Sequence, residues 1–458
     1  MARLKNRSLD MTVGEPYKLL INFALPLLFG NLFQQLYNTA DSVIVGNLIG
    51  TKALAAVGAG FPFFMILTAV FMGIGIAATV LVSQAMGAKD YERANLIINT
   101  IYKVSLIAIV PLTLIGYFST DAALRLINVP DDGTFVMAAD YLRVLFLGMV
   151  CTMGFNMNSG ILQGLGDSVT SLKYLILSTI LNIGLDLLLA GPAGMGVAGA
   201  ALATVLAQLV SWVLGLRFLN KHFPNIKLNL FKLDFDKDIF KRASEIALPS
   251  AIQNALFSMG IMAMMGLIGS YGSNFMAGYN VANKIDTLIY FPILSLASAT
   301  TTFIGQNVGA KKMDRIYEGL KKSLVLSVAS TVSMALLMYP FLRPMIEFFI
   351  GSKDPLPVRL EVIDAALNYL DSVLPFYFLM GTLFTFNAVL RGVGQGYIPM
   401  FATLCALWVA RVPTAYFIAS RWGKEYIYYS SGIGWILGNL ASGGYYFSMR
   451  WKEKLDFS

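Results

Sequence analysis

Long apolar runs follow one another along the chain, and short stretches of charged or turn-forming residues separate them. A run of about 20 apolar residues is long enough for an α-helix to cross about 30 Å of hydrocarbon. The pattern therefore predicts an all-α integral membrane protein with twelve transmembrane helices. The expected helices are 18–47, 53–82, 95–117, 137–161, 170–190, 195–217, 240–269, 275–304, 318–346, 364–389, 396–420 and 427–449.

Composition supports the membrane class. Of the 458 residues, 57% are hydrophobic and only 13% are charged, whereas soluble domains average about 25% charged residues. This balance excludes a large soluble enzyme domain. A single histidine, His222, offers almost nothing for a zinc site or a histidine-based catalytic triad. Cys151 and Cys405 lie inside apolar runs, so we interpret them as small core residues.

Lysine and arginine are distributed unevenly between the two sets of loops. With twelve helices both termini lie on one side, and that side holds 23 basic residues against eight on the other. Cytoplasmic loops of membrane proteins carry the excess of lysine and arginine. We therefore expect both termini and the 218–239 loop in the cytoplasm.

The second half of the chain repeats short segments of the first half. Ala24-Leu25-Pro26 recurs as Ala247-Leu248-Pro249, and Gln84–Lys89 recurs as Gln306–Lys311, at offsets of 223 and 222 residues. The repeat predicts two pseudo-symmetric six-helix lobes of the same orientation, an arrangement typical of transporters that rock about a central site. The expected division is an N-lobe at 1–217, a cytoplasmic linker at 218–239 and a C-lobe at 240–458.

Two carboxylates fall inside predicted helices of the N-lobe. A charge at a helix centre costs about 2.5–3.5 kcal/mol on the insertion scale, so Asp41 and Asp186 are candidates for function. Tyr37 and Asn182 lie four residues before them and so share their helix faces. Interhelical hydrogen bonding alone is the alternative for the neutral polar residues. The candidate site is Asp41, Asp186, Asn182, Tyr37 and Thr204, with Gln34 and Gln208 as secondary candidates.

The predicted C-lobe has its own polar set, comprising Gln253, Lys284, Asp286 and Arg411. Lys284 and Asp286 are two residues apart and point to different helix faces, so they do not form an obvious pair. We interpret this set mainly as structural pairing across helices, with a substrate or gating role as the alternative.

The chain resembles the multidrug and toxic compound extrusion (MATE) family. The resemblance rests on the two parallel halves, the acidic first helix, Asn182-x-x-x-Asp186 and the Gly-Gln-x-x-Gly-Ala motif at Gly305–Ala310. Its details are most similar to the bacterial branch with an acidic site in the N-lobe. It implies export of cationic and amphipathic xenobiotics in exchange for protons or sodium ions.

Matched to this family, Asp41 is the first-helix carboxylate with Tyr37 beside it, Asn182 and Asp186 are the fifth-helix pair, and Thr204 is the sixth-helix hydroxyl. The resemblance implies that Na⁺, if it couples transport, binds at Asp41, Asn182, Asp186 and Thr204. Gln253 stands near the position where some relatives carry an acidic residue in the seventh helix, which favours the N-lobe over a C-lobe ion site.

The sequence thus predicts an ion-coupled antiporter in a bacterial cytoplasmic membrane. Without a Walker A motif, the energy source is an ion gradient or a separate subunit. The absence of H-E-x-x-H and G-x-S-x-G motifs argues against an enzyme, and we expect no cofactor, no nucleic acid and a monomer. The expected partners are small organic cations or amphipathic drugs and the lipid bilayer. The alternative is a flippase for lipids or lipid-linked saccharides, in which Lys284 and Arg411 attract an anionic headgroup.

Overall fold

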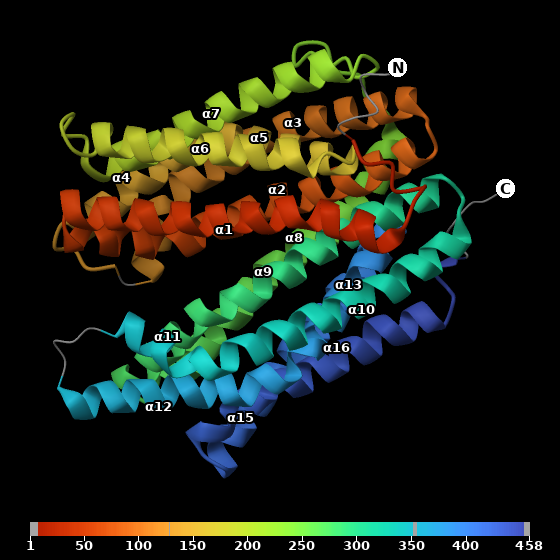
Figure 1. Ribbon diagram of the computed structural model, residues 1–458. Coiled ribbons are helices and arrows are strands. Elements are labelled where there is room, and N and C mark those ends of the chain that lie inside the picture. Colours follow the sequence, from red (N-terminus) through yellow and green to blue (C-terminus); the bar gives the residue numbers. More distant parts are fainter. Residues whose placement is uncertain (1–7, 128, 351–354, 453–458) are drawn as a thin grey trace. The chain divides into compact units, whose positions relative to one another are not determined.

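The computed structural model describes residues 8–127, 129–350 and 355–452, and these are helical with short connections (Figure 1). The elements are α1 (Pro16–Leu48), α2 (Thr51–Gly87), α3 (Tyr91–Leu126), α4 (Thr134–Leu147), α5 (Met149–Gly164), α6 (Ser168–Leu189), α7 (Gly196–His222), α8 (Lys237–Gly269), α9 (Ser273–Gly309), α10 (Met313–Met338), η1 (Tyr339–Phe341), α11 (Leu342–Phe349), α12 (Leu356–Val373), η2 (Leu374–Phe376), α13 (Tyr377–Gly392), α14 (Tyr397–Leu404), η3 (Cys405–Arg411), α15 (Val412–Arg421), η4 (Lys424–Tyr429) and α16 (Ser430–Phe447).

Every predicted transmembrane helix has a counterpart among these elements. Ten segments of the described chain are long and apolar enough to cross a membrane, and the bent pair α4–α5 makes an eleventh. The twelfth is α16, which is rich in glycine, serine and tyrosine and is therefore less apolar. The all-α membrane fold is confirmed.

The prediction of one continuous helix over 137–161 is wrong. The chain bends by 53° between α4 and α5. The break falls at Gly148, where α7 packs so tightly that a Cβ atom would overlap the Val205 side chain. Several later spans are interrupted at prolines: Pro340 lies in η1 and Pro375 in η2. Proline removes a backbone donor and disturbs the preceding turn, which explains these short irregular stretches.

The chain forms two compact units. Unit 1 comprises Met1–Val13, Leu25–Asn254 and Gly305–Lys311, and unit 2 comprises Gly14–Ala24, Ala255–Ile304 and Lys312–Ser458. The chain thus passes between units within α1, α8 and α9. The lobe boundaries at 217 and 240 stay a prediction.

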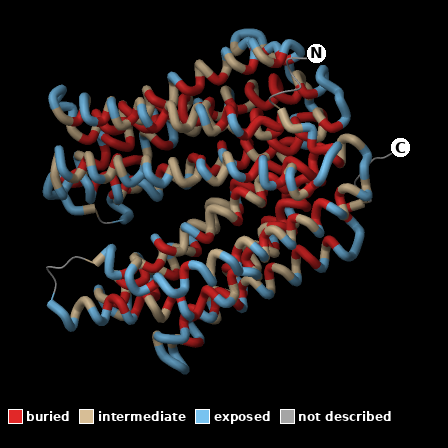
Figure 2. The backbone as a smooth tube through the Cα atoms, viewed as in Figure 1, coloured by how far each residue is buried: buried red, intermediate tan, exposed pale blue. Residues whose placement is uncertain are grey.

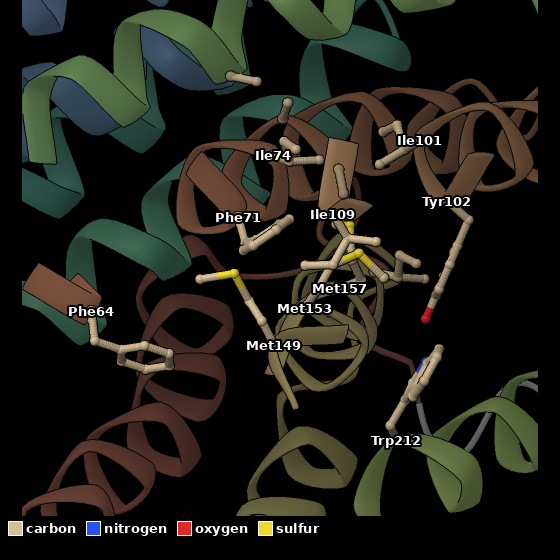
Figure 3. Packing of buried hydrophobic residues seen from close by; sticks show 14 of the residues in the cluster. Phe64, Phe71, Ile74, Ile101, Tyr102, Ile109, Met149, Met153, Met157 and Trp212 are labelled. Carbon is tan, nitrogen blue, oxygen red and sulfur yellow. The ribbon is translucent and has the colours of Figure 1, made fainter. Parts of the chain in front are cut away.

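Methionine and aromatic side chains fill the core of unit 1 (Figure 3). Met149, Met153 and Met157 are spaced by four residues, so they lie on one face of α5, and all three are fully buried. Tyr102 and Trp212 close one side of this core. Asn158 links them, because it accepts a hydrogen bond from the Tyr102 hydroxyl at 2.5 Å and donates to the Trp212 carbonyl oxygen at 2.8 Å.

The outward helix faces are apolar and exposed. Along α3, Ile107, Val110, Leu114 and Phe118 are all at least half exposed, and Phe118 is 76% exposed. Figure 2 shows the buried residues gathered where helices of one unit face each other. An apolar exterior of this kind suits contact with lipid rather than water.

The repeat in the sequence reappears in the contacts. Thr79 on α2 donates to the Gly160 carbonyl oxygen at 2.9 Å, and Thr301 on α9 donates to the Ala388 carbonyl oxygen at 3.2 Å. The two threonines are 222 residues apart, and each ties a long helix to the fourth span of its half. The second helix of each half therefore packs in the same way.

Candidate functional site

Two buried carboxylates lie side by side in unit 1. Asp41 on α1 is 9% exposed and Asp186 on α6 is 0% exposed. The two side chains are close enough to interact electrostatically. One carboxylate oxygen of Asp41 and both of Asp186 are buried and have no hydrogen-bond partner of normal geometry. The pair predicted from separate helices is thus brought together.

A short network of neutral polar groups flanks the carboxylates. Thr204 on α7 lies between two neighbours: its hydroxyl is 3.0 Å from the Tyr37 hydroxyl and accepts from Asn182 Nδ2 at 3.2 Å. This contact orients the Asn182 amide, whose Oδ1 is buried without a partner. The five residues predicted as the site therefore gather from α1, α6 and α7.

In the part of the chain that the structure describes, neither Asp41 nor Asp186 forms an ion pair with a basic side chain. The four ion pairs there join other residues: Lys18–Glu15, Lys52–Asp132, Arg143–Asp121 and Arg343–Glu347. Buried charges are normally paired, so two carboxylates without a cation are costly when both are ionised. The arrangement can take up a proton, or a cation that the surrounding carboxylate, amide and hydroxyl oxygens ligate.

The structure adds one residue that the sequence analysis missed. Tyr141 on α4 is 5% exposed and interacts electrostatically with Asp41, Tyr37 and Asp186. A search for carboxylates within apolar runs does not find it, because a tyrosine there fits equally well as core. Its only signal is a hydroxyl in a helix that the fold packs next to α7.

The secondary N-lobe candidates do not join the cluster. Gln208 accepts a hydrogen bond from the Thr152 hydroxyl at 2.6 Å, which makes it part of the α5–α7 contact. Gln34 is half-buried on α1, and no hydrogen bond ties it to Asp41 or Asp186 in the described chain. Gln253 is buried on α8.

A second carboxylate site lies in unit 2, with different surroundings. Asp286 on α9 accepts from the Tyr369 hydroxyl at 3.1 Å and interacts electrostatically with Arg411. Lys284 is exposed and points elsewhere, with Nζ 5.3 Å from the centroid of the Phe349 ring. The guanidinium of Arg411 thus supplies Asp286 with a positive neighbour that Asp41 and Asp186 lack.

Comparison with known proteins supplies the family. The MatE family model matches residues 26–188 and 249–417, which is most of the chain. The chain belongs to the MatE family. MatE proteins are membrane transporters and not enzymes, so the expectations of a multi-pass transporter are confirmed, and the two matched segments correspond to the two halves of the internal repeat.

Several named relatives of this MatE chain are multidrug proteins. It is 26% identical to the probable multidrug resistance protein YpnP of Bacillus subtilis, with 99% of each chain covered. It is 27% identical to the probable multidrug resistance protein NorM of Thermotoga maritima, covering 88% of this chain and 86% of that protein. A crystal structure described as the outward-facing conformation of a multidrug resistance MATE transporter is 25% identical, has a TM-score of 0.87 and covers 97% of each chain.

Proposed function

We propose that this MatE protein exports cationic and amphipathic small molecules in exchange for protons or sodium ions, by alternating access. The observation that carries the proposal is the buried pair Asp41 and Asp186, which interact with each other and form no ion pair with a basic residue of the described chain. The multidrug names of the relatives support the export of drugs.

The site works by competition for negative charge. In a low-dielectric pocket a carboxylic acid resists ionisation, and a second carboxylate nearby raises its proton affinity further. A proton or Na⁺ entering from outside neutralises the pair and displaces an organic cation. When the coupling ion leaves toward the cytoplasm, the charge returns and the next organic cation binds.

The ion gradient supplies enough free energy for this exchange. The membrane potential contributes about 2.3 kcal/mol per 100 mV for each net charge that the exchange moves, and nothing when one monovalent ion is exchanged for one monovalent organic cation. A proton gradient adds about 1.4 kcal/mol per pH unit. One coupling ion therefore supports a concentration gradient of tenfold or more in the exported compound.

A lipid or lipid-linked saccharide flippase is the alternative function. It requires a positive surface that attracts an anionic headgroup, and Arg411 and Lys284 are its candidates. Arg411 interacts electrostatically with the carboxylate of Asp286, which offsets its positive charge, and Lys284 is exposed beside an aromatic ring. The multidrug relatives do not favour this alternative either.

Everted membrane vesicles test the proposal. Ethidium uptake is measured with a proton gradient, a sodium gradient or neither, in the wild type, Asp41→Asn and Asp371→Asn. Asp371 is an exposed carboxylate on α12, outside the cluster, and serves as the matched control. We expect only Asp41→Asn to lose gradient-driven uptake. Full uptake by Asp41→Asn contradicts the mechanism, and the more effective gradient identifies the coupling ion.

The orientation belongs to the same proposal. We place the 218–239 linker and both termini in the cytoplasm of a bacterial cell and the transporter in the cytoplasmic membrane as a monomer. A cysteine at exposed Lys232, in a background without Cys151 and Cys405, tests it. An impermeant maleimide should label this cysteine in everted vesicles and not in intact cells, and the reverse result would invert the topology.

A further inference from the structure

A short non-helical segment before α1 is partly buried. The segment Ser8–Val13, called the strap here, contains Met11 at 0% exposure and Thr12 at 6%, whereas Asp10 and Val13 are exposed. It belongs to unit 1 together with Gly305–Lys311, the end of α9 and the turn after it. Buried backbone groups of a non-helical segment need partners, and those partners identify what the strap contacts.

At least four hydrogen bonds between described residues fasten the strap. The Met11 amide donates to Gln306 Oε1 at 2.7 Å, and Gln306 Nε2 donates to the Leu9 carbonyl oxygen at 3.4 Å. Asn307 Nδ2 donates to the Met11 carbonyl oxygen at 3.1 Å. The Leu9 amide donates to the Gly166 carbonyl oxygen at 3.0 Å. The strap thus links the end of α9 to the turn between α5 and α6.

The contact at Gly166 leaves no room for a side chain. Gly166 has φ +86°, and a Cβ atom there would lie 2.6 Å from the Leu9 carbonyl oxygen and 3.2 Å from Gln306 Nε2. Any other residue would be strained by its backbone conformation and would also push the strap away. The turn, the strap and α9 are therefore fitted to one another.

The α9 residues that bind the strap lie where the end of α9 meets the end of the repeat-related helix α2. A Cβ atom on Gly87 of α2 would overlap the backbone of Gln306, and one on Gly309 of α9 would overlap the backbone of Gln84. Gly309 and Gln306 follow Gly87 and Gln84 by 222 residues each. The glycine at each helix end therefore contacts the equivalent glutamine of the other helix. Small residues that let backbones touch favour close helix packing in membranes.

The strap has a local turn of its own and is followed by a glycine in the left-handed region. Asp10 accepts from the Thr12 amide at 2.9 Å and from its hydroxyl at 2.6 Å, which gives the segment its own local turn. Gly14, at φ +97°, follows directly and α1 begins at Pro16. A glycine in the left-handed region allows the chain direction to change next to the fastened residues.

We propose that the strap is a cytoplasmic latch. It holds the ends of α2 and α9 together while the acidic site is open to the outside, and it is released when those ends part to open the site to the cytoplasm. The inference rests on the proposed alternating-access function and topology. Gln306 and Asn307 are then positioning residues that set the balance between the two states, without touching drug or coupling ion.

Two readouts on the full-length protein in nanodiscs test the latch. Hydrogen exchange of the Leu9 and Met11 amides reports whether the strap is fastened. Spin labels at Glu92→Cys and Asp314→Cys, in a background with Cys151 and Cys405 replaced by alanine, report the separation of the α2–α3 and α9–α10 connections. Both labelled positions are exposed.

Gln306→Leu removes two of the four hydrogen bonds. A single hydrogen bond contributes enough for about a fivefold change in an equilibrium. We expect the population with the longer label distance to rise at least fivefold over the shorter one, and Met11 amide protection to fall by a similar factor. Asn307→Ala removes one bond and serves as the milder variant if Gln306→Leu does not fold.

Thr79→Val is the matched control, because it also removes a buried side-chain-to-backbone hydrogen bond of unit 1 but lies away from the strap. It should change neither readout. The latch is contradicted if Gln306→Leu and Asn307→Ala leave the distance distribution unchanged while the Met11 amide loses protection. It is equally contradicted if that amide stays protected in protein with the longer distance. Neither readout needs a drug or a gradient, so failure of the antiport mechanism is seen separately, in the Asp41→Asn export assay.

Discussion

Each of the two units buries carboxylate side chains, but the groups that surround these carboxylates differ between the units. In unit 1, Asp41 and Asp186 lie together with free oxygens and no basic neighbour. In unit 2, Asp286 shares its surroundings with the Tyr369 hydroxyl and the guanidinium of Arg411. The charge of a buried carboxylate near a basic side chain is balanced within the protein. A buried pair of carboxylates without such a side chain needs a bound proton or cation to balance its charge. On the proposed function, we therefore expect ion and drug exchange in unit 1 and a structural interaction in unit 2.

The largest expected effect comes from removing the acidic pair. Asp186→Asn should reduce gradient-driven ethidium export to the background of empty vesicles, because one neutral amide removes the charge for which the two cations compete. Asp286→Asn should retain at least a third of the wild-type rate. Equal losses in both variants, at matched protein levels in everted vesicles, would abolish the distinction between the units.

A basic side chain introduced beside the acidic pair of unit 1 should remove the difference between the two units. Thr204→Lys places an ammonium next to Tyr37 and Asn182, beside the acids. We expect organic-cation affinity to fall about tenfold or more, equivalent to about 1.4 kcal/mol, because the ammonium occupies the site that the drug needs. Fluorescence titration with ethidium measures it. Thr204→Val, which removes the hydroxyl without adding charge, separates the charge effect from the loss of hydrogen bonds.

Removing the resident cation of unit 2 tests the other side of the contrast. Arg411→Leu leaves Asp286 without its positive neighbour, so the folded protein should lose about 1–3 kcal/mol of stability. The loss should appear as a lower midpoint of thermal unfolding in detergent, with export per folded molecule preserved. An Arg411→Leu protein of unchanged stability but no export would place Arg411 in the transport mechanism.

The smallest effect concerns a carboxylate outside the spans. Hydrogen bonds from the Thr134 side chain and backbone, together with Lys52, lower the pKa of Asp132. An acid whose pKa is lower in the folded state stabilises that state above its ordinary pKa of about 3.9 and loses this contribution as the pH falls further. Because the group is exposed and solvent screens it, this contribution is small, and Asp132→Asn should leave the midpoint of unfolding at pH 7 nearly unchanged. A clear drop at pH 7 would show that this ion pair is more than a surface contact.

Much of the fold follows from the sequence because membrane spans are set by the length of apolar runs. The helix ends were less accessible: α2 extends to Gly87 and α3 to Leu126, beyond the expected 82 and 117, since helices continue where their ends meet water and caps. The bend at Gly148 depends on how closely α7 approaches, and no local pattern encodes that approach.

The candidate site was predictable in its charged members and in the neutral residues Tyr37, Asn182 and Thr204, but not in Tyr141. A carboxylate in an apolar run is costly, so Asp41 and Asp186 stand out, and their spacing to Tyr37 and Asn182 brings those residues in. Tyr141 carries no such signal. The strap at Leu9–Met11 was also missed, because its polar partners Gln306 and Asn307 lie almost 300 residues away in the chain.

The central claim is that the coupling ion and the organic cation compete for binding to the buried pair Asp41 and Asp186. The most direct measurement is the dissociation constant of a fluorescent organic cation for the purified wild-type protein, titrated against pH at fixed sodium and against sodium at fixed pH. The account predicts that affinity weakens up to tenfold per pH unit on acidification, or in proportion to Na⁺, and that Asp41→Asn reduces this dependence. An affinity that is independent of both ions would contradict the account.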